Sequence, residues 1–412
     1  MKIVGMIVVL FLIVFTIEKT LNESFEGLLV KAKKYAHINV SQNDGLHKLI
    51  LKVVQKLVSV YPSPELYNKP DHIDGVGAQS NLSNELGPNS TIVTSTKELK
   101  QAITNVKPGQ TILLSPGIYD VTSRYLLLKN SGTFARPITL RANTLGDAVL
   151  RSNSVEGLLI QGKNWRIENL IFKGVKGKDG SIEHAIHIVG DADNIQIKNN
   201  KFINFNSHIK SNGKPNAQGK IEYPDNLLIL NNDIYNEWKR NTHSPASPID
   251  LVGGNYVIVK NNFIADFGKY GKKGFGTTYG AYMKGGGIGG IFENNVVMCE
   301  WRVPHTSPMD VRIGLSFGNG GTGGQFCADK KCEYEHTDGV MRNNTILNCV
   351  NDVGIYLNKS YNTLIENNAI RSSLGVDVRF EQSSAEIRGN VIEGRVKARD
   401  GATITVDDNI IE

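Results

Sequence analysis

Two pairs of lysine and arginine are the residues of this sequence best suited to chemistry. Lys359 precedes Arg379 by 379 − 359 = 20 residues, and Lys284 precedes Arg312. A lysine close to other cations has a lowered pKa, so that it can act as a base. An arginine stays charged and stabilises developing negative charge through its planar guanidinium group. Either pair would suit removal of a weakly acidic proton next to a neutralised carboxylate.

A repeat that ends in Asn shows which elements must position these residues. Nine segments each hold a short alternating apolar run, a pair ending in Asn, and a second apolar run, with the Asn at 169, 200, 232, 262, 295, 344, 368, 390 and 409. The spacings run from 19 to 49 residues, so the shortest sets the basic coil and the longer ones carry inserted loops. A strand-only repeat of this length indicates a strand-built solenoid.

Asn suits such a coil because it tolerates the left-handed backbone region at a sharp bend, and stacked amides can hydrogen-bond to one another. We therefore predict an all-β fold, a right-handed, single-stranded parallel β-helix of the pectin-lyase-like kind. A sandwich of hairpins is the weaker alternative, because its turn residues would vary.

The chain divides into four parts. Residues 1–19 hold the apolar run Ile3–Ile17, which predicts a signal peptide or a retained membrane anchor. Residues 20–61 form an amphipathic, basic helical segment, and 62–91 read as a linker. Residues 92–412 form the β-helix domain. The protein is thus expected to be exported, either secreted or anchored on the outer side of the cytoplasmic membrane, with membrane association through its N-terminal segment.

A short helix is expected where the domain begins. Ser95-Thr96-Lys97-Glu98 is a capping box, followed by an apolar stripe of Leu99, Ala102, Ile103 and Val106. A helix placed here would cover the open first coil of the solenoid.

Alternation along the first strand of each coil assigns two faces. The inward residues are Ile186, Ile249, Met283, Leu315, Leu357, Val378 and Val396. The outward residues are His187, Asp250, Tyr282, Lys284, Arg312, Ser316, Tyr356, Asn358, Asp377, Arg379, Lys397 and Arg399. A rigid row of basic, acidic and aromatic groups suits an extended polymer, although any solvated sheet face is polar.

From this outward face we predict substrate-binding residues on six strands: His187, Asp250, Tyr282, Lys284, Arg312, Tyr356, Asn358 and Asp377. The insertion 318–338 is expected to overhang the face, and it holds Glu333, Glu335, His336 and Asp338.

The four cysteines leave alternatives open. Cys327 and Cys332 lie in the large insertion and could close it with a disulfide in an exported protein. Cys299 and Cys349 follow the Asn of their coils, so they either stack in the core as small apolar residues or pair.

Two coils resemble a known family. The segment from Gly354 to Asn368, GIYLNKSYNTLIENN, followed by VDVRF from Val376 to Phe380, is similar to the catalytic region of the chondroitinase B and alginate lyase family of polysaccharide lyases. The early segments PGQTILLSPGIYD and RPITLRA resemble that family's first coils. The resemblance implies β-elimination on a uronic-acid polysaccharide, with Lys359 as the base and Arg379 as its catalytic partner.

The resemblance also bears on metal binding. Family members hold calcium with acids seven and five residues before the lysine, positions that are Asp352 and Gly354 here. Asp352 is therefore the one expected ligand, and calcium stays open as a cofactor because a hard cation needs six or more oxygens.

Two classes of function follow from the sequence. The first is an exported lyase acting on an acidic polysaccharide; the second is a non-catalytic β-helix that binds glycans or a surface partner. Hydrolysis is weaker, since Asp250 and Asp377 lie several coils apart. The net charge of +6 is small, and no phosphate loop or strongly basic surface indicates nucleic acid.

Overall fold

The computed structural model describes residues 75–79, 89–177, 179–270, 276–307, 309–319 and 322–412. The predicted N-terminal anchor within 1–19 and the amphipathic segment 20–61 lie outside these residues. Within the described ranges, no helix is long and apolar enough to cross a membrane. Part of the predicted linker, residues 75–79, packs on the β-helix: the Gly77 amide donates to Asn261 O at 2.8 Å.

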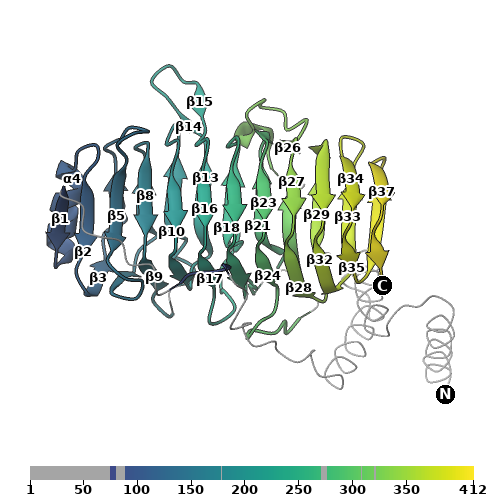
Figure 1. The fold of residues 1–412 in the computed structure, drawn as a ribbon, viewed down its shortest axis with the longest axis horizontal. Coiled ribbons are helices and arrows are strands. Elements are labelled where there is room, and N and C mark those ends of the chain that lie inside the picture. The colour runs from purple at the N-terminus through teal and green to yellow at the C-terminus, as the bar shows by residue number, and fades with distance from the viewer. Residues whose placement is uncertain (1–74, 80–88, 178, 271–275, 308, 320–321) are drawn as a thin grey trace. The chain divides into compact units, whose positions relative to one another are not determined.

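Three long parallel sheets make up the described domain, and each complete coil contributes one strand to each sheet (Figure 1). The predicted parallel β-helix is confirmed. We name the sheets by the order of the strands within a coil, so that the second strand is the one before the Asn of the repeat.

The first-strand sheet contains β4 (Leu126–Leu128), β7 (Glu156–Ile160), β10 (His184–Val189), β13 (Ser207–Asn212), β18 (Ile249–Val252), β21 (Thr278–Lys284), β25 (Arg312–Phe317), β29 (Ile355–Asn358), β33 (Gly375–Arg379) and β36 (Arg395–Arg399). The second-strand sheet contains β1 (Ser90–Val93), β2 (Thr111–Leu114), β5 (Ile138–Ala142), β8 (Trp165–Glu168), β11 (Gln196–Lys198), β16 (Leu228–Leu230), β19 (Ile258–Lys260), β23 (Ile291–Glu293), β27 (Val340–Arg342), β31 (Thr363–Glu366), β34 (Ser384–Arg388) and β37 (Thr403–Asp407). The third-strand sheet contains β3 (Gly117–Val121), β6 (Ala148–Ser152), β9 (Leu170–Gly174), β12 (Lys201–Ile203), β17 (Asp233–Tyr235), β20 (Phe263–Ala265), β24 (Val296–Met298), β28 (Thr345–Cys349), β32 (Ala369–Ser373), β35 (Val391–Ile392) and β38 (Ile410–Ile411).

The Asn ladder predicted from the repeat links the coils between the second and third strands. The side-chain amide of each ladder Asn donates to the side-chain oxygen of the next, at 2.8–3.2 Å, from Asn200 through to Asn409. The left-handed residue is the one before it, for example Asn261 with φ 55°. The two tasks that the sequence assigned to a single Asn are thus divided between the two members of the pair.

The first repeat is one residue out of register with this ladder. Glu168 on β8 pairs with Lys198 on β11, so Asn169 aligns with Asn199 rather than with Asn200. Asn169 itself is left-handed, with φ 58°, and its side chain accepts a hydrogen bond from Asn199 at 2.8 Å. The ladder therefore begins at Asn200.

The core runs along the inside of the coils. The predicted inward residues of the first strands are buried in it, apart from Val396, which is partly buried in the last of these strands. The helix α4 (Thr96–Asn105) buries Leu99 and Ile103 against the first coil, as predicted. Ser95 caps it by accepting from the Glu98 amide at 3.2 Å, while Glu98 accepts from the Thr94 amide at 2.7 Å.

Two insertions rise beside the first-strand sheet. One is the antiparallel hairpin of β14 (Lys214–Pro215) and β15 (Ile221–Glu222), which projects at the top of Figure 1. The other, between β25 and β27, contains the 3-10 turn η2 (Gly324–Phe326) and β26 (His336–Thr337). The strand β26 lies between β22 (Gly287–Ile288) and β30 (Ser360–Tyr361) in a small parallel sheet.

Both cysteine pairs form disulfides. Cys327 and Cys332 close part of the second insertion, as the sequence allowed, with a Cα–Cα distance of 5.4 Å. Cys299 and Cys349 join neighbouring coils, with a Cα–Cα distance of 4.9 Å, and both are fully buried. Cys299 and Cys349 therefore do both things that the sequence left open: they form a disulfide, and they pack in the core.

Candidate functional site

Strand register aligns one outward residue from each first strand between β10 and β36 into what we call the outer row. Its members are His187, Lys210, Asp250, Tyr282, Ser316, Tyr356, Asp377 and Lys397. The outward position predicted for seven of these residues is confirmed; the eighth, Lys210, was not among the predicted outward residues. Neighbouring members lie on adjacent parallel strands, about 4.8 Å apart, so adjacent side chains can interact directly.

Lys210 is the residue that sequence reasoning missed. It lies on β13, whose sequence SHIKSN lacks the apolar alternation of the other first strands. The available signal was the coil itself: between the third strand β12 and the next second strand β16, a closed coil requires a first strand.

Lys210, Asp250 and Lys284 form a compact ionic cluster on three adjacent strands. Asp250 Oδ2 lies 2.8 Å from Lys210 Nζ, and Asp250 Oδ1 lies 3.5 Å from Lys284 Nζ. Lys284 Nζ also donates to the hydroxyl of Tyr282 at 3.1 Å and lies 4.3 Å from the centre of that ring. Two cations therefore share one carboxylate, and Tyr282 holds the second of them.

Burial shapes the protonation of this cluster. Burial alone would raise the pKa of Asp250, but the two lysines outweigh it and lower that pKa to about 2. The pKa of Lys284 is lowered, chiefly by burial and further by Lys210, although Asp250 and Glu335 act to raise it. Burial raises the pKa of Tyr282 well above its usual value. Asp250 is thus a fixed anion, Tyr282 a fixed neutral donor, and Lys284 the group whose proton is easiest to remove.

A cleft of about 410 Å³ opens onto this cluster. Its floor includes Lys210, Asp250 and Lys284, and its walls include Tyr223 beyond the hairpin and Phe326 from η2. The Tyr223 hydroxyl donates to Phe326 O at 3.1 Å, so the two insertions meet above the sheet. Phe326 is 57% exposed and offers an apolar ring beside the charged floor.

The second insertion packs directly against the end of β21, as predicted for an overhanging loop. Glu335 accepts from the Gly285 amide at 3.1 Å, one residue after Lys284. His336 does not reach the cleft: it is fully buried, stacks on Phe317 with ring centres 4.1 Å apart, and burial lowers its pKa to about 3. Glu333 and Asp338 are exposed.

Lys359 and Arg379 occupy a different environment. Lys359 has a left-handed backbone, with φ 53°, and so lies at the corner after β29 rather than on the strand face. Arg379 is ion-paired with Asp400, and its guanidinium lies 4.6 Å from the ring centre of Phe380. Neither Lys359 nor Arg379 lines the cleft. The two residues are close in the fold, since the Lys359 amide donates to Arg379 O at 3.5 Å. However, Lys359 forms the corner after β29, and Arg379 pairs with Asp400.

The other predicted binding residues of the last coils are engaged with their neighbours. Tyr356 packs with Tyr282 in a buried cluster on the outer face, and its hydroxyl accepts from Asn358 at 2.7 Å. Asp377 receives a two-pronged hydrogen bond from Arg399, at 2.9 and 2.7 Å.

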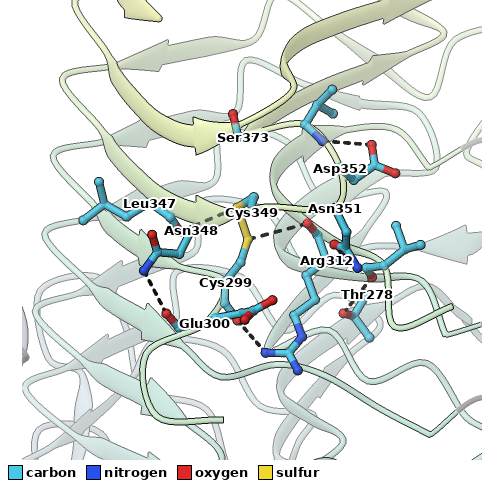
Figure 2. Close-up of a disulfide and its surroundings, with 12 residues drawn as sticks. Thr278, Cys299, Glu300, Arg312, Leu347, Asn348, Cys349, Asn351, Asp352 and Ser373 are labelled. Carbon is cyan, nitrogen blue, oxygen red and sulfur yellow. Dashed lines mark hydrogen bonds between the residues drawn. A yellow bond between two sulfur atoms is a disulfide. The ribbon is translucent and has the colours of Figure 1, made fainter. Parts of the chain in front are cut away.

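The predicted placement of Arg312 is wrong. Arg312 aligns with Thr278 at the start of β21, not with Lys284 at its end. It is fully buried, and its guanidinium donates to the Asp310 carboxylate at 2.8 Å and to the carbonyl of Cys299 at 2.8 Å. Figure 2 shows Arg312 beside the Cys299–Cys349 disulfide. Arg312 therefore stabilises the segment between Cys299 and Asp310 by hydrogen bonds, and it does not form a pair with Lys284.

The residues at Asp352 do not fit calcium. Asp352 is 7% exposed, and its Oδ1 accepts from the neighbouring Val353 amide at 2.8 Å. Gly354 brings no side chain, and the groups of three or more potential metal ligands found among the described residues do not include Asp352. A calcium ion would lack the six or more oxygens that it requires.

Two family models match the chain. A model described as the Pel9A-like, right-handed β-helix region matches residues 81–254, and a general right-handed β-helix region matches residues 331–412. Together with the observed coils, they identify the chain as a right-handed parallel β-helix protein. Residues 81–254 are similar in sequence to the β-helix of Pel9A-like proteins. The finer resemblance to chondroitinase B stays a prediction, since neither matching model carries that name.

Comparison with solved structures gives distant likenesses. An alginate lyase from Paenibacillus sp. str. FPU-7 is 15% identical, with 78% of this chain and 95% of that chain covered and a TM-score of 0.48. Pectate lyase Pel9A is 13% identical, with 82% and 79% covered and a TM-score of 0.41. The GH136 lacto-N-biosidase from Eubacterium ramulus is 13% identical, with 95% and 77% covered and a TM-score of 0.49. No curated protein matches the chain. These likenesses carry no function over to this chain.

Proposed function

We propose that this protein is a polysaccharide lyase that cleaves a uronic-acid-containing polymer by β-elimination at the cluster of Lys210, Asp250 and Lys284. The observation that supports this most is a buried lysine with a lowered pKa at the floor of a cleft, next to a second lysine. A neutral amine can accept the proton beside the sugar carboxylate, and the neighbouring ammonium can neutralise that carboxylate.

In this reaction each cluster residue has one task. Lys210 binds the carboxylate, and neutral Lys284 Nζ takes the proton from the adjacent carbon. The electrons of that C–H bond form the C=C bond as the glycosidic C–O bond breaks, and protonated Lys284 returns the proton to the leaving oxygen. Asp250 and Tyr282 position the two amines through the contacts of 2.8, 3.5 and 3.1 Å described above.

Hydrolysis fits the cluster less well. It requires a carboxylic acid that stays protonated near neutral pH, whereas Asp250 has a pKa of about 2. The cleft combines Tyr223 and Phe326 with charged groups, which suits sugar rings that carry acidic substituents. The two disulfides support a proposal of export, because such bonds persist in oxidising compartments.

The test is incubation of the full chain with alginate, chondroitin and pectin while the ultraviolet absorbance of the unsaturated product is followed. We expect absorbance to rise with at least one of these polymers and to be lost in Lys284→Met. Lys198→Met, on the second-strand sheet, is the matched control and should keep full activity. Binding of a polymer without any rise in absorbance would favour the non-catalytic glycan-binding alternative and overturn the lyase.

A further inference from the structure

A second cluster of polar side chains lies beside the proposed catalytic cluster and takes no part in it. Glu156 on β7 and His184 and His187 on β10 each offer one ligand atom, and these atoms all lie within 4.8 Å of one another. We propose that these three residues bind a divalent first-row transition ion, with zinc as the representative case. The proposal does not depend on the lyase function.

The hydrogen bonds around His187 leave a nitrogen lone pair facing Glu156. The Asn212 side chain donates to Gly213 O at 2.9 Å, so its oxygen is the atom that lies 2.6 Å from His187 Nε2. An amide oxygen only accepts, so Nε2 carries a hydrogen. In the neutral ring Nδ1 is then unprotonated, yet it lies 2.8 Å from Glu156 Oε1, another acceptor. A positive species must lie between them, either a proton or a metal ion.

His184 is arranged in the same way. Its Nδ1 lies 3.1 Å from the carbonyl oxygen of Ser207, to which it donates, so that Nε2 keeps its lone pair. Metal-binding histidines characteristically donate their second nitrogen to a carbonyl or amide oxygen in this manner.

The donor set indicates the kind of ion. Two imidazoles and one carboxylate suit zinc and its first-row neighbours, whereas calcium prefers oxygen ligands. Ligands bound at about 2.1 Å lie about 3.0–3.4 Å apart, so Glu156 and His187 need to separate by only a few tenths of an ångström. The side chains of His187 and Glu156 keep 15% and 13% exposure, which leaves the remaining coordination positions open to water or a sugar oxygen.

The neighbouring charges permit such an ion. Lys210 aligns with His187 on the next strand and would repel a free cation, but Asp250 holds its ammonium group at 2.8 Å. All four cysteines are in disulfides, so no thiol competes for the metal.

The experiment measures zinc bound by the full chain after metal stripping, equilibration with zinc chloride and desalting. We expect one zinc ion per chain, about tenfold or more weaker binding in His187→Ala and in Glu156→Gln, and an intermediate loss in Asn212→Ala. His243→Ala, which removes an exposed histidine, is the control and should bind as the unaltered chain does.

Cobalt provides a second readout. Cobalt(II) in this site should give a visible absorption spectrum that is lost in Glu156→Gln, a change that keeps the shape of the side chain. Equal melting temperatures of the metal-free forms would show that the variants fold. Absence of retained zinc in the unaltered chain, or zinc binding by His187→Ala equal to that of the unaltered chain, would overturn the proposal and leave a proton between His187 and Glu156.

Discussion

The middle coils, β13 to β21, and the last coils, β29 to β36, carry similar charged residues on the same sheet, but these residues differ in burial and in the loops that surround them. In the middle coils Asp250 is 1% exposed and two insertions wall a cleft above it. In the last coils Arg379 is 35% exposed on its side chain and pairs with an exposed Asp400. Residue types alone do not make a site; burial and the surrounding loops change the pKa values that chemistry needs.

The largest expected difference between the two regions is in the cost of losing an acid. Asp250→Asn leaves the buried Lys284 and the partly buried Lys210 without a counter-charge, which should lower the free energy of unfolding by about 3–5 kcal/mol. Asp377→Asn removes the partner of the half-buried Arg399 and should cost about 1 kcal/mol or less. Chemical denaturation of both variants measures the difference. Equal losses would contradict the contrast between the regions.

The Asn ladder should show a smaller contrast of the same kind. Asn262 is fully buried and accepts from the amide and the side chain of Asn232 at 3.0 and 2.9 Å. Asn262→Ala would leave these donors unsatisfied, at a cost of about 2–3 kcal/mol. Asn409 makes equivalent bonds to Asn390 but is partly exposed, so Asn409→Ala should cost under about 1 kcal/mol because water replaces the lost bonds. Melting temperatures of the two variants compare them; a greater loss at Asn409 would refute this account.

Acid should destabilise the coils between β13 and β26 before it destabilises the last coils. Burial lowers the pKa of His208 and of His336 to about 3, from 6.5, and the sequence has no histidine after His336. The folded state binds fewer protons than the unfolded state below pH 6.5, so stability is full above that pH and falls as the pH drops. Each histidine contributes a loss of about 1.4 kcal/mol per pH unit, or about 2 kcal/mol between pH 6.5 and 5.

His336→Gln tests the acid effect, because it removes the titrating ring. The unfolding free energy of this variant should depend less steeply on pH between 6.5 and 5 than that of the unaltered chain. His243→Gln, at an exposed position, should leave the dependence unchanged. Parallel pH curves for His336→Gln and the unaltered chain would show that His336 does not contribute.

The fold could be predicted from the sequence because the ladder needs Asn at a fixed place in each coil. The outer row could be predicted because successive residues of a strand point to opposite faces of the sheet, and the ladder Asn fixes where each strand lies. Lys210 could not be found in this way, since Ser207 to Asn212 lacks an apolar alternation. Its strand is defined by pairing with β10 and β18, which only the closed coil reveals.

Arg312 was misplaced because the inward and outward alternation is interrupted within β25. Leu315 lies in the main core while Ile313, two residues earlier, packs in the outer cluster with Tyr282 and Tyr356. The break lies at Gly314, where an added Cβ would lie 2.4 Å from Gly354 O. Counting by twos from Leu315 therefore assigns the wrong face to residues before this glycine. The Asp250 ion pair and the cleft walls distinguish the environment of Lys284 from that of Lys359. Both depend on residues far apart in the sequence, so they could not be predicted from it.

The central claim is that Lys284 rather than Lys359 is the base, and a matched pair of variants tests it most directly. With the polymer that gives the largest rise in ultraviolet absorbance, kcat should fall by about 100-fold or more in Lys284→Met and stay within about threefold of the unaltered value in Lys359→Met. Activity that survives in Lys284→Met and disappears in Lys359→Met would place the reaction on the last coils and contradict the account.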